Sequence, residues 1–342
     1  MRAVVVSKHG GPEVLEFVDR PMPEPKAGEV RIRVRATSIN HLDIWVRKGV
    51  EGHQFPLPMI VGCDMAGEIE KVGDQVQGVK VGDRVAVAPG FSCGVCRACA
   101  GGKQNLCRHY GIFGETCDGG DAEFAVVPAR NLLAMPAGME FTTAAATPLV
   151  FLTAWHMLVD RCGIRPGDDV LVHAAGSGVS TAAIQIAKMF GARVFTTVGS
   201  DEKAEAARAL GPDAVINYKA QDFAKEVRAL TGKRGCDIIV DHVGGETFTK
   251  SIKTLAAGGR VVTCGATSSP KLESDLRLVF FKNLSILGST MGGLGEMHEV
   301  WSHVAVGRMK PVIAKVMKLA DVREAHRLVE GRAVFGKIVL EP

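Results

Sequence analysis

The amino-acid sequence predicts an α/β protein with two domains, a β-rich domain followed by a doubly wound parallel sheet. Three observations lead to this prediction. Short strand-like segments interrupted by Gly and Pro fill about the first 150 residues, and apolar strands alternate with amphipathic helices after about Phe151. The length of 342 residues also exceeds that of most single domains.

The clearest strand of the first part covers residues 30–36, with the sequence VRIRVRA. Its apolar residues alternate with Arg31, Arg33 and Arg35, which predicts one buried face and one solvated face. Residues 66–72 and 84–88 are further strand candidates. Together these segments predict a compact β-rich domain.

A loop within this part carries four cysteines at CxxCxxCx7C spacing: Cys93, Cys96, Cys99 and Cys107. Four thiolates at this spacing can surround one zinc ion as a tetrahedron, and such a closed site has a structural role because it leaves no position for substrate. A disulfide framework and free thiols are the alternatives. The odd total of nine cysteines, with no apolar segment after Met1, favours a reducing compartment, and we expect a cytoplasmic protein.

The second part reads as repeated strand and helix units. Such repeats imply a parallel, doubly wound sheet, whose ligands bind at the carboxyl ends of the strands. The predicted strands are residues 170–173, 193–198, 214–216, 238–241 and 260–264, and the predicted helices are residues 179–190, 201–210, 223–230 and 247–255.

The turn after the first of these strands has the sequence AGSGVS, a degraded form of the GxGxxG motif. Small residues there let backbone amides approach a dinucleotide pyrophosphate at the helix N-terminus. A turn of small residues that binds no ligand is the alternative. The expected contacts are Gly176, Ser177, Gly178, Val179 and Ser180.

The end of the second strand indicates which dinucleotide binds. The residue about 20 positions past the glycines, where a carboxylate would hold the ribose 2′-hydroxyl of NAD, is Val198. Ser200, Lys203 and Tyr218 can instead meet a 2′-phosphate, which favours NADPH over NADH, although the acidic pair after Ser200 opposes a phosphate. The alternative is that Ser200 caps the next helix and Lys203 is a solvated cation.

Several segments resemble the medium-chain dehydrogenase/reductase superfamily: GGPEVLEF, the four-cysteine loop, LTAWHML, the βα repeats and FGKIVL. The resemblance implies a GroES-like catalytic domain from residues 1–150 and 291–342, with the zinc loop at 93–107, and a Rossmann nucleotide-binding domain from residues 151–290. It also implies a homodimer or homotetramer, with residues 285–289 near the edge strand that pairs subunits.

Zinc alcohol dehydrogenases of this superfamily hold a catalytic metal at positions that correspond here to Asn40, Cys63 and Leu149. Two of these residues cannot bind zinc usefully, and Leu42 corresponds to the hydroxyl residue that relays the proton. An alternative site remains open, built from His41, Cys63, Asp64 and His156.

The segment SINHLDIWVRKG resembles the NxxDxxxRxG pattern of the quinone oxidoreductase and zeta-crystallin branch, whose members lack catalytic zinc and use NADPH. The resemblance implies catalytic roles for Asn40, Asp43 and Asp64. For Asp43 and Arg47 a structural ion pair at i, i+4 spacing is the alternative. Further cofactor contacts implied by the resemblance are His41, Thr153, Val243, Gly265, Ala266 and Lys337. His173 and His242 are expected to be hydrogen-bonded structural residues.

We therefore expect hydride transfer from NADPH to a quinone or an α,β-unsaturated carbonyl, an enone or enoyl thioester, with one structural zinc and no catalytic zinc. A zinc-dependent alcohol dehydrogenase and a non-catalytic, crystallin-like NADPH-binding protein are the alternatives. The expected partner is a small apolar carbonyl compound. The net charge of +4 is spread along the chain and no apolar run reaches membrane-spanning length, so we expect neither nucleic acid nor membrane as a partner.

Overall fold

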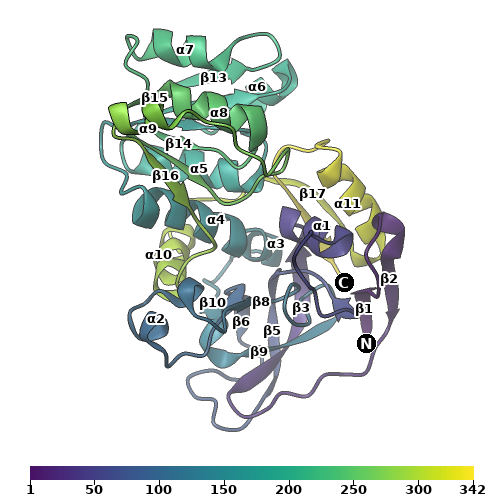
Figure 1. Ribbon diagram of the computed structural model, residues 1–342. Helices are drawn as coiled ribbons and strands as arrows, with labels where there is room; N and C mark the ends of the chain where they lie inside the picture. Colours follow the sequence, from purple (N-terminus) through teal and green to yellow (C-terminus); the bar gives the residue numbers. More distant parts are fainter. The chain divides into compact units, whose positions relative to one another are not determined.

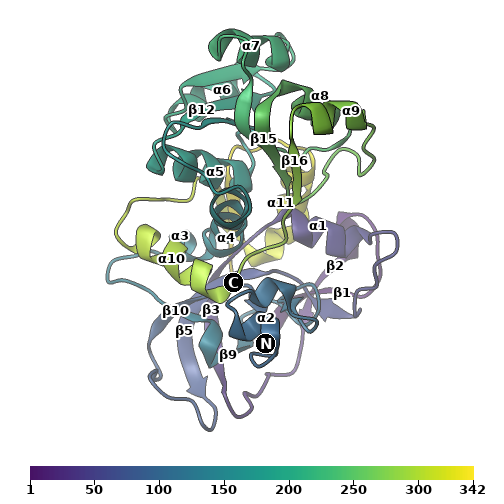
Figure 2. The same cartoon turned by 60° about the vertical axis from the view of Figure 1, so that its left-hand side comes forward.

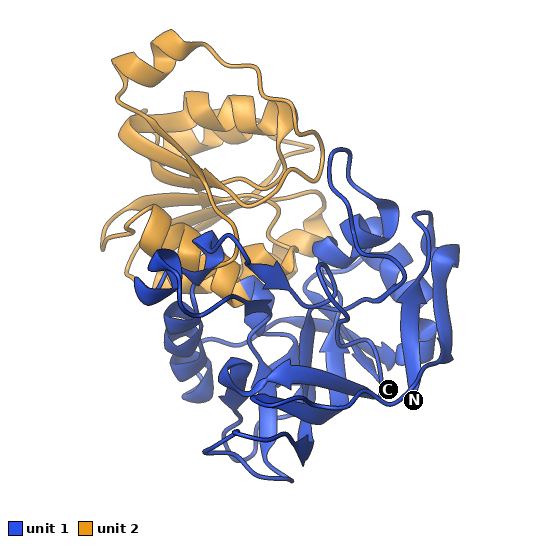
Figure 3. Ribbon diagram, turned by 60° about the horizontal axis from the view of Figure 1, so that its bottom comes forward, with its two compact units in different colours: residues 1–150, 293–342 blue, residues 151–292 orange.

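The structure is a computed structural model that describes residues 1–342. It divides into two compact units, Met1–Val150 with Gly293–Pro342 (unit 1) and Phe151–Gly292 (unit 2), shown in two colours in Figure 3. The boundaries expected from the sequence, after residues 150 and 290, lie within two residues of these. No helix is both long and apolar enough to span a bilayer.

Unit 1 is built on a seven-stranded sheet in the order β10-β6-β5-β3-β18-β17, with β9 paired to β3. Figure 2 labels β3, β5, β9 and β10 of this sheet. The other sheets of this unit are β2-β1-β4 and β7-β8. The strands are β1 Arg2–Val6, β2 Leu15–Asp19, β3 Glu29–Ser38, β4 Met59–Ile60, β5 Asp64–Val72, β6 Arg84–Val87, β7 Gly90–Phe91, β8 Gly111–Ile112, β9 Phe124–Pro128, β10 Leu132–Ala134, β17 Ile313–Lys318 and β18 Lys337–Glu341. The α-helices are α1 His41–Lys48, α2 Arg97–Ala100, α3 Phe141–Ala145, α10 Leu294–Ala305 and α11 Val322–Glu330. Short 3-10 turns are η1 Pro12–Val14, η2 Gln104–Leu106, η3 Ala129–Asn131 and η5 Leu319–Asp321.

The alternation predicted for β3 is correct except at Arg31. Arg33 and Arg35 are exposed, but Arg31 is buried, so the polar face is not solvated along its whole length. The Arg31 guanidinium is satisfied by ion pairs with Glu24 at 2.8 Å and Glu70 at 2.6 Å. These acceptors are supplied from elsewhere in the chain, and the alternation of β3 alone could not reveal them.

Unit 2 is a six-stranded parallel sheet whose helices alternate with its strands along the chain (Figure 1). The strand order, β13-β12-β11-β14-β15-β16, is that of the doubly wound dinucleotide-binding fold. The strands are β11 Asp169–Val172, β12 Arg193–Val198, β13 Ala214–Asn217, β14 Cys236–Val240, β15 Leu255–Thr263 and β16 Ser285–Gly288. The helices are α4 Pro148–Trp155, which begins in unit 1, η4 His156–Arg161, α5 Gly178–Met189, α6 Asp201–Arg208, α7 Phe223–Leu230, α8 Gly245–Thr254 and α9 Leu276–Phe281. The predicted α/β fold class is therefore confirmed, with a GroES-like domain and a Rossmann domain.

The core of unit 2 explains why its strands read as apolar runs. β11 and β14 are central strands with neighbours on both sides, and their side chains are buried on both faces of the sheet. The buried cluster of this unit includes Leu171, Phe195, Ile239 and Val261 from four adjacent strands. β16 lies at the edge of the sheet, so its outer backbone groups have no strand partner in the chain.

Candidate functional site: a cysteine cluster, a buried lysine cluster and a dinucleotide turn

The four predicted zinc ligands form one cluster in unit 1, which we call the four-cysteine cluster. Their sulfurs all lie within 4.8 Å of one another. The measured Sγ–Sγ distances are 3.9 Å between Cys93 and Cys99, 3.6 Å between Cys96 and Cys99, and 3.5 Å between Cys93 and Cys107. Zn–S bonds of about 2.3 Å give a tetrahedron with edges of about 3.8 Å, so these distances fit one zinc ion.

The surroundings of the cluster also favour thiolates over disulfides. All nine cysteines of the chain are free, which excludes the disulfide alternative in this structure. Backbone N–H groups of Val95 and Cys96 donate hydrogen bonds that lower the pKa of Cys93 to about 6. The His109 N–H donates to Cys107 Sγ at 3.3 Å. A thiolate is the form that binds zinc, and these backbone donors favour it at Cys93, whereas the pKa of Cys96 is raised to about 11 beside the other thiols.

Three strand ends meet elsewhere in unit 1 and form a second cluster. Asn40 follows the end of β3, Asp64 begins β5 and Lys337 begins β18. β3 pairs with both other strands, and Ser38 lies opposite Asp64 on one side and Val339 on the other. This register brings three residues that are far apart in the sequence to one place. We call Asn40, Cys63, Asp64 and Lys337 the lysine cluster.

The side chains of the lysine cluster are almost wholly buried and bonded to one another. Lys337 Nζ donates to Asn40 Oδ1 at 2.5 Å and to the Ile39 carbonyl at 2.8 Å, and lies 3.5 Å from Asp64 Oδ2. Asn40 Nδ2 donates to Asp64 Oδ2 at 2.8 Å and approaches Cys63 Sγ at 3.2 Å. Because an ammonium only donates, it fixes the Asn40 amide with its oxygen toward Lys337. Both ends of the amide are thus engaged by the protein.

Two residues of the lysine cluster, Asn40 and Cys63, are those that the family resemblance matches to catalytic-metal ligands of zinc alcohol dehydrogenases, and Leu149 is the third. Leu149 is in place, since its N–H donates to Asp64 Oδ1 at 2.9 Å, but its side chain offers no ligand atom. Burial raises the pKa of the Cys63 thiol well above its usual range, so the neutral thiol is favoured. The Asn40 oxygen faces an ammonium and its nitrogen is a donor. These residues do not fit a catalytic zinc.

The alternative zinc site from His41, Cys63, Asp64 and His156 combines residues of both units, since His156 belongs to unit 2, and it stays a prediction. Within unit 1 the four-cysteine cluster is the one group of three or more His, Cys, Asp or Glu side chains whose ligand atoms converge. His41 begins α1 and packs edge-on against Trp45, with ring centroids 5.1 Å apart. Burial lowers the pKa of His41, helped by the charges of Arg332 and Lys48.

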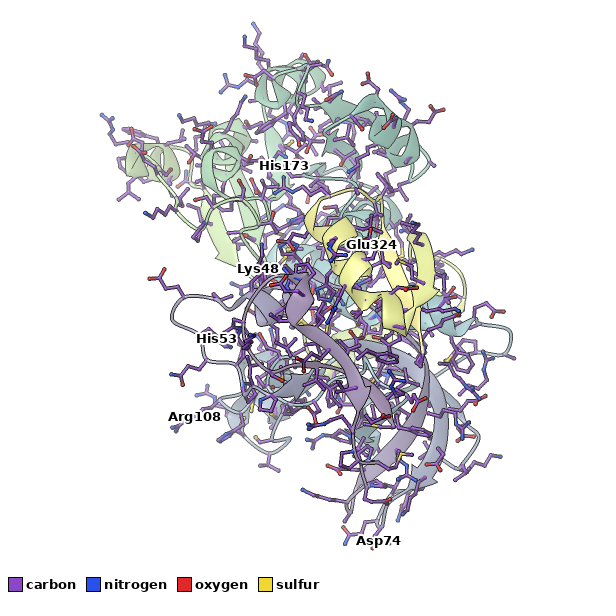
Figure 4. All side chains as sticks on the ribbon, turned by 90° about the vertical axis from the view of Figure 1, so that its right-hand side faces the viewer. Lys48, His53, Asp74, Arg108, His173 and Glu324 are labelled. Carbon is purple, nitrogen blue, oxygen red and sulfur yellow. The ribbon has the colours of Figure 1, made fainter.

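Asp43 lies beside the lysine cluster but does not form the ion pair with Arg47 that was one sequence-based alternative. Asp43 Oδ2 accepts the Asn40 N–H at 2.7 Å as the capping box of α1. Burial, reinforced by the nearby Asp121 carboxylate, raises the pKa of Asp43 to about 8. Arg47 bonds instead with Glu330 at 2.7 Å, an acid that also pairs with Lys48, a residue labelled in Figure 4.

The predicted cofactor contacts of unit 2 gather at the carboxyl edge of its parallel sheet. Residues 176–180 follow β11, Ser200 and Lys203 follow β12, Tyr218 follows β13, Val243 follows β14, and Gly265 and Ala266 follow β15. The last two turns lie side by side, because the Ser268 N–H donates to the Val243 carbonyl at 2.8 Å and the Thr267 N–H to the His242 carbonyl at 3.1 Å. This is the edge at which ligands of doubly wound sheets bind.

The turn after β11 is suited to a pyrophosphate. α5 begins at Gly178, and its N-cap Ser177 makes no side-chain capping bond, so the first amides of the helix are not capped by that side chain. Ser180 lies at the closest approach of helix and strand, where its hydroxyl donates to the His173 carbonyl at 2.6 Å and meets His242 Nε2 at 2.8 Å. His173 and His242 are hydrogen-bonded, as expected of structural histidines.

The turn after β12 brings the residues expected at a 2′-phosphate together. Ser200 caps α6 by accepting the Lys203 N–H at 3.3 Å, which confirms the capping role. Tyr218 packs so closely on Gly199 that a Cβ there would lie 2.8 Å from its hydroxyl. A hydroxyl and a helix N-terminus in the turn after β12 therefore lie beside a tyrosine from the turn after β13.

Two of the expected cofactor contacts have other partners in the structure. Lys337, expected near the cofactor phosphates, directs its ammonium into the lysine cluster. Thr153 is buried, with its hydroxyl 3.9 Å from Met291 Sδ. The sequence did not reveal the bond between Lys337 and Asn40, although both residues lie in segments that carry the family resemblance. It also did not reveal that Asp121 and the Leu149 N–H lie beside the cluster.

Comparison with known proteins agrees with both units. Residues 178–306 match the family model described as zinc-binding dehydrogenase, and residues 26–137 match the alcohol dehydrogenase GroES-like domain. A solved structure of an NAD-dependent alcohol dehydrogenase is 51% identical with a TM-score of 0.96, and each chain is fully covered.

Two curated relatives carry different activities. The quinone oxidoreductase of Homo sapiens is 30% identical over 99% of this chain and 97% of its own length. The acryloyl-coenzyme A reductase of Sulfurisphaera tokodaii is 30% identical over the full length of both chains. The chain therefore belongs to the medium-chain dehydrogenase/reductase superfamily and is an oxidoreductase of that superfamily with a zinc-binding cysteine cluster.

Proposed function

We propose that the protein transfers a hydride from NADPH to a quinone or to a C=C bond conjugated with a carbonyl, an enone or enoyl thioester, without a catalytic metal. The observation that carries this proposal is the Lys337 ammonium, 2.5 Å from Asn40 Oδ1 at the position of a catalytic zinc ligand. Oxidising an alcohol needs a group that stabilises an alkoxide, a role that zinc fills and Leu149 and Asn40 do not. A quinone or conjugated carbonyl places the incoming charge on its own oxygen, so it needs less help.

In this proposal the residues of the chain bind the cofactor and hold the polar groups of the site in position. The amides that begin α5 bind the pyrophosphate, and Ser200 and Tyr218 bind the 2′-phosphate. NADPH supplies the hydride when bound. Asn40 acts as a positioning residue, because its amide is held on both sides by Lys337 and Asp64. The proton that completes the reduction comes from solvent or from a group that the proposal leaves unassigned.

A panel of substrates tests the reaction. The purified protein with NADPH is expected to reduce at least one of a quinone, an enone and an enoyl thioester, at rates well above those for oxidation of primary or secondary alcohols with NADP⁺. Oxidation of alcohols alone, abolished by chelation, would contradict the proposal.

The choice of NADPH is tested at Ser200. Ser200→Asp keeps a good helix cap for α6 but places a carboxylate where a 2′-phosphate binds. We expect the ratio of kcat/KM for NADPH to that for NADH to fall by about tenfold or more, about 1.4 kcal/mol. Ser200→Asn, a neutral cap of the same shape, is the control. Equal ratios in both variants would show that no 2′-phosphate binds at this turn.

A zinc-dependent alcohol dehydrogenase is the second candidate, favoured by the name of the solved structure that is 51% identical. The two candidates differ in metal content, because a closed four-thiolate site accounts for one zinc per chain and a catalytic site adds a second. Metal analysis of the purified protein separates them.

The proposed assembly is a homodimer through β16, in the cytoplasm. β16 is an edge strand with Ile286 exposed on it, and the neighbouring α9 exposes Leu276, Phe280 and Phe281. Nine free cysteines suit a reducing compartment. Sedimentation analysis should give a dimer, or a tetramer built from such dimers, and Ile286→Lys should weaken it, whereas a monomer at micromolar concentration would contradict the assembly.

A further inference from the structure

A buried chain of polar side chains crosses unit 2 beneath the nucleotide-binding edge. It joins Thr197 on β12, His173 after β11, Ser251 on α8 and Asp241 after β14, and each of these residues is at most 2% exposed. Figure 4 labels His173 among the elements of unit 2. The His173 Nδ1 to Thr197 Oγ1 distance is 3.1 Å, His173 Nε2 to Ser251 Oγ is 2.9 Å, and Ser251 Oγ to Asp241 Oδ2 is 2.8 Å.

The donors and acceptors of this chain have one consistent order. The Ser251 hydroxyl donates its one proton to Asp241 or to the Thr247 carbonyl at 2.9 Å, so it accepts from His173 Nε2–H. Burial lowers the pKa of His173 and keeps the imidazole neutral, so Nδ1 accepts the Thr197 hydroxyl proton. Ser251 lies between the histidine and the aspartate and is wholly buried, so this is not the arrangement of a nucleophilic triad.

At one end of this series of hydrogen bonds, Thr197 holds the turn after β11, where the pyrophosphate is expected. Thr197 Oγ1 accepts the N–H of Ala174 at 3.1 Å, and the Thr197 carbonyl accepts the N–H of Ala175 at 2.9 Å. Ala174 has a φ of +56°, in the left-handed region that residues with a Cβ disfavour. The turn therefore needs bonds that hold it in this conformation, and Thr197 supplies them.

The other end holds the turn after β14. Asp241 Oδ1 accepts the N–H groups of Val243 at 2.9 Å and Gly244 at 3.1 Å. Gly244 has a φ of +81°, and a Cβ there would lie 2.3 Å from the Ser269 carbonyl oxygen, so this turn is also tightly constrained. One hydrogen-bonded chain thus runs from the backbone of the β11 turn to the backbone of the β14 turn, with His173 at its centre.

We propose that His173 is a positioning residue for the dinucleotide: it couples the turn after β11 to the turn after β14, so that both present their backbone to one bound cofactor. His173 touches no cofactor atom itself. The role does not depend on which substrate is reduced, and it applies to NADPH and NADH alike because neither turn carries the 2′-phosphate contacts. Loss of the imidazole leaves both turns in place but no longer coupled, and cofactor affinity falls.

The test compares two buried histidines. His173→Phe keeps a ring of similar size and removes both hydrogen bonds, whereas His326→Phe in unit 1 removes none, because neither nitrogen of the buried His326 has a partner. The Kd for NADPH and for NADH is measured by fluorescence titration of the full-length protein without substrate, together with the thermal midpoint. We expect His173→Phe to raise both Kd values about tenfold, as the loss of one to two hydrogen bonds would. His326→Phe should leave both unchanged.

Two further variants keep the test decisive. His173→Gln restores a donor and an acceptor and should recover part of the affinity. Thr197→Val removes the hydroxyl that links His173 to the turn after β11. This variant replaces His173→Phe in the test if His173→Phe does not fold. Unchanged Kd values in a folded His173→Phe or Thr197→Val variant would overturn the proposal, as would equal losses in His326→Phe. Because no substrate is present, a failure of the proposed reduction reaction does not affect this result.

Discussion

Unit 1 contains two clusters of converging side chains that are suited to a cation, and the source of the cation differs between them. In the four-cysteine cluster three pairs of sulfurs lie 3.5 to 3.9 Å apart, and a bound zinc ion would offset the repulsion among four thiolates at such distances. In the lysine cluster the cation is part of the chain, the Lys337 ammonium beside Asn40 and Asp64. The difference teaches that one domain can offer a cation two kinds of site, one that needs a metal from outside the chain and one that a lysine of the chain occupies.

The largest expected effect concerns the four-cysteine cluster. Cys99→Ser removes one of four ligands, and we expect zinc to fall from one per chain to nearly none and the free energy of unfolding to fall by several kcal/mol, since metal binding contributes directly to folding. Metal analysis and urea denaturation measure both. Cys117→Ser is the matched control, because Cys117 is free and lies outside the cluster. Full zinc content in Cys99→Ser would show that the metal is held elsewhere.

The next effect tests whether the ammonium serves as the cation of its cluster. Lys337→Met leaves the buried Asp64 carboxylate without its positive partner, which typically costs about 3 to 5 kcal/mol. Adding Asp64→Asn to the same chain removes the unpaired charge, and the double variant should recover part of the loss in urea denaturation. A cost below about 1 kcal/mol for Lys337→Met would mean that the ammonium does not stabilise the cluster.

A smaller effect should appear in the dependence of stability on pH. Burial raises the pKa of Asp43 to about 8, so the folded protein holds a proton that the unfolded chain releases near pH 4. The stability contributed by this group is therefore greatest at low pH and falls as the pH rises from about 4 to about 8.

Asp43→Asn removes this titration. The free energy of unfolding of the variant relative to the natural chain should rise with pH, by up to about 1.4 kcal/mol per pH unit between pH 5 and pH 7.5. Asp74→Asn, at an exposed loop position, is the matched control and should show no such trend. A constant difference between Asp43→Asn and the natural chain across this range would contradict a raised pKa.

The parts of the structure that the sequence predicted depend on local patterns. Alternation of apolar strands and helices after Phe151 predicted the parallel sheet, and the spacing of Cys93, Cys96, Cys99 and Cys107 predicted a cluster that the fold indeed assembles. The helix cap at Ser200 is local as well. Each of these features is decided within about twenty residues of sequence, where periodicity and spacing are informative.

The parts that the sequence could not predict depend on pairing between distant segments. Lys337 is 297 residues from Asn40, and the two meet because β18 pairs with β3. Arg47 was considered as a partner of Asp43 four residues away, yet it bonds with Glu330, 283 residues distant. The partner of a charged residue cannot be predicted from the sequence alone, because strand register and helix packing decide which opposite charge is within reach.

In our proposal the metal of this protein is structural and the chemistry belongs to the nicotinamide. The most direct measurement is anomalous scattering at the zinc edge from a crystal of the active protein, combined with its zinc content. We predict one zinc per chain, with a single anomalous peak among Cys93, Cys96, Cys99 and Cys107. A second peak beside Cys63, with two zinc ions per chain, would contradict the account.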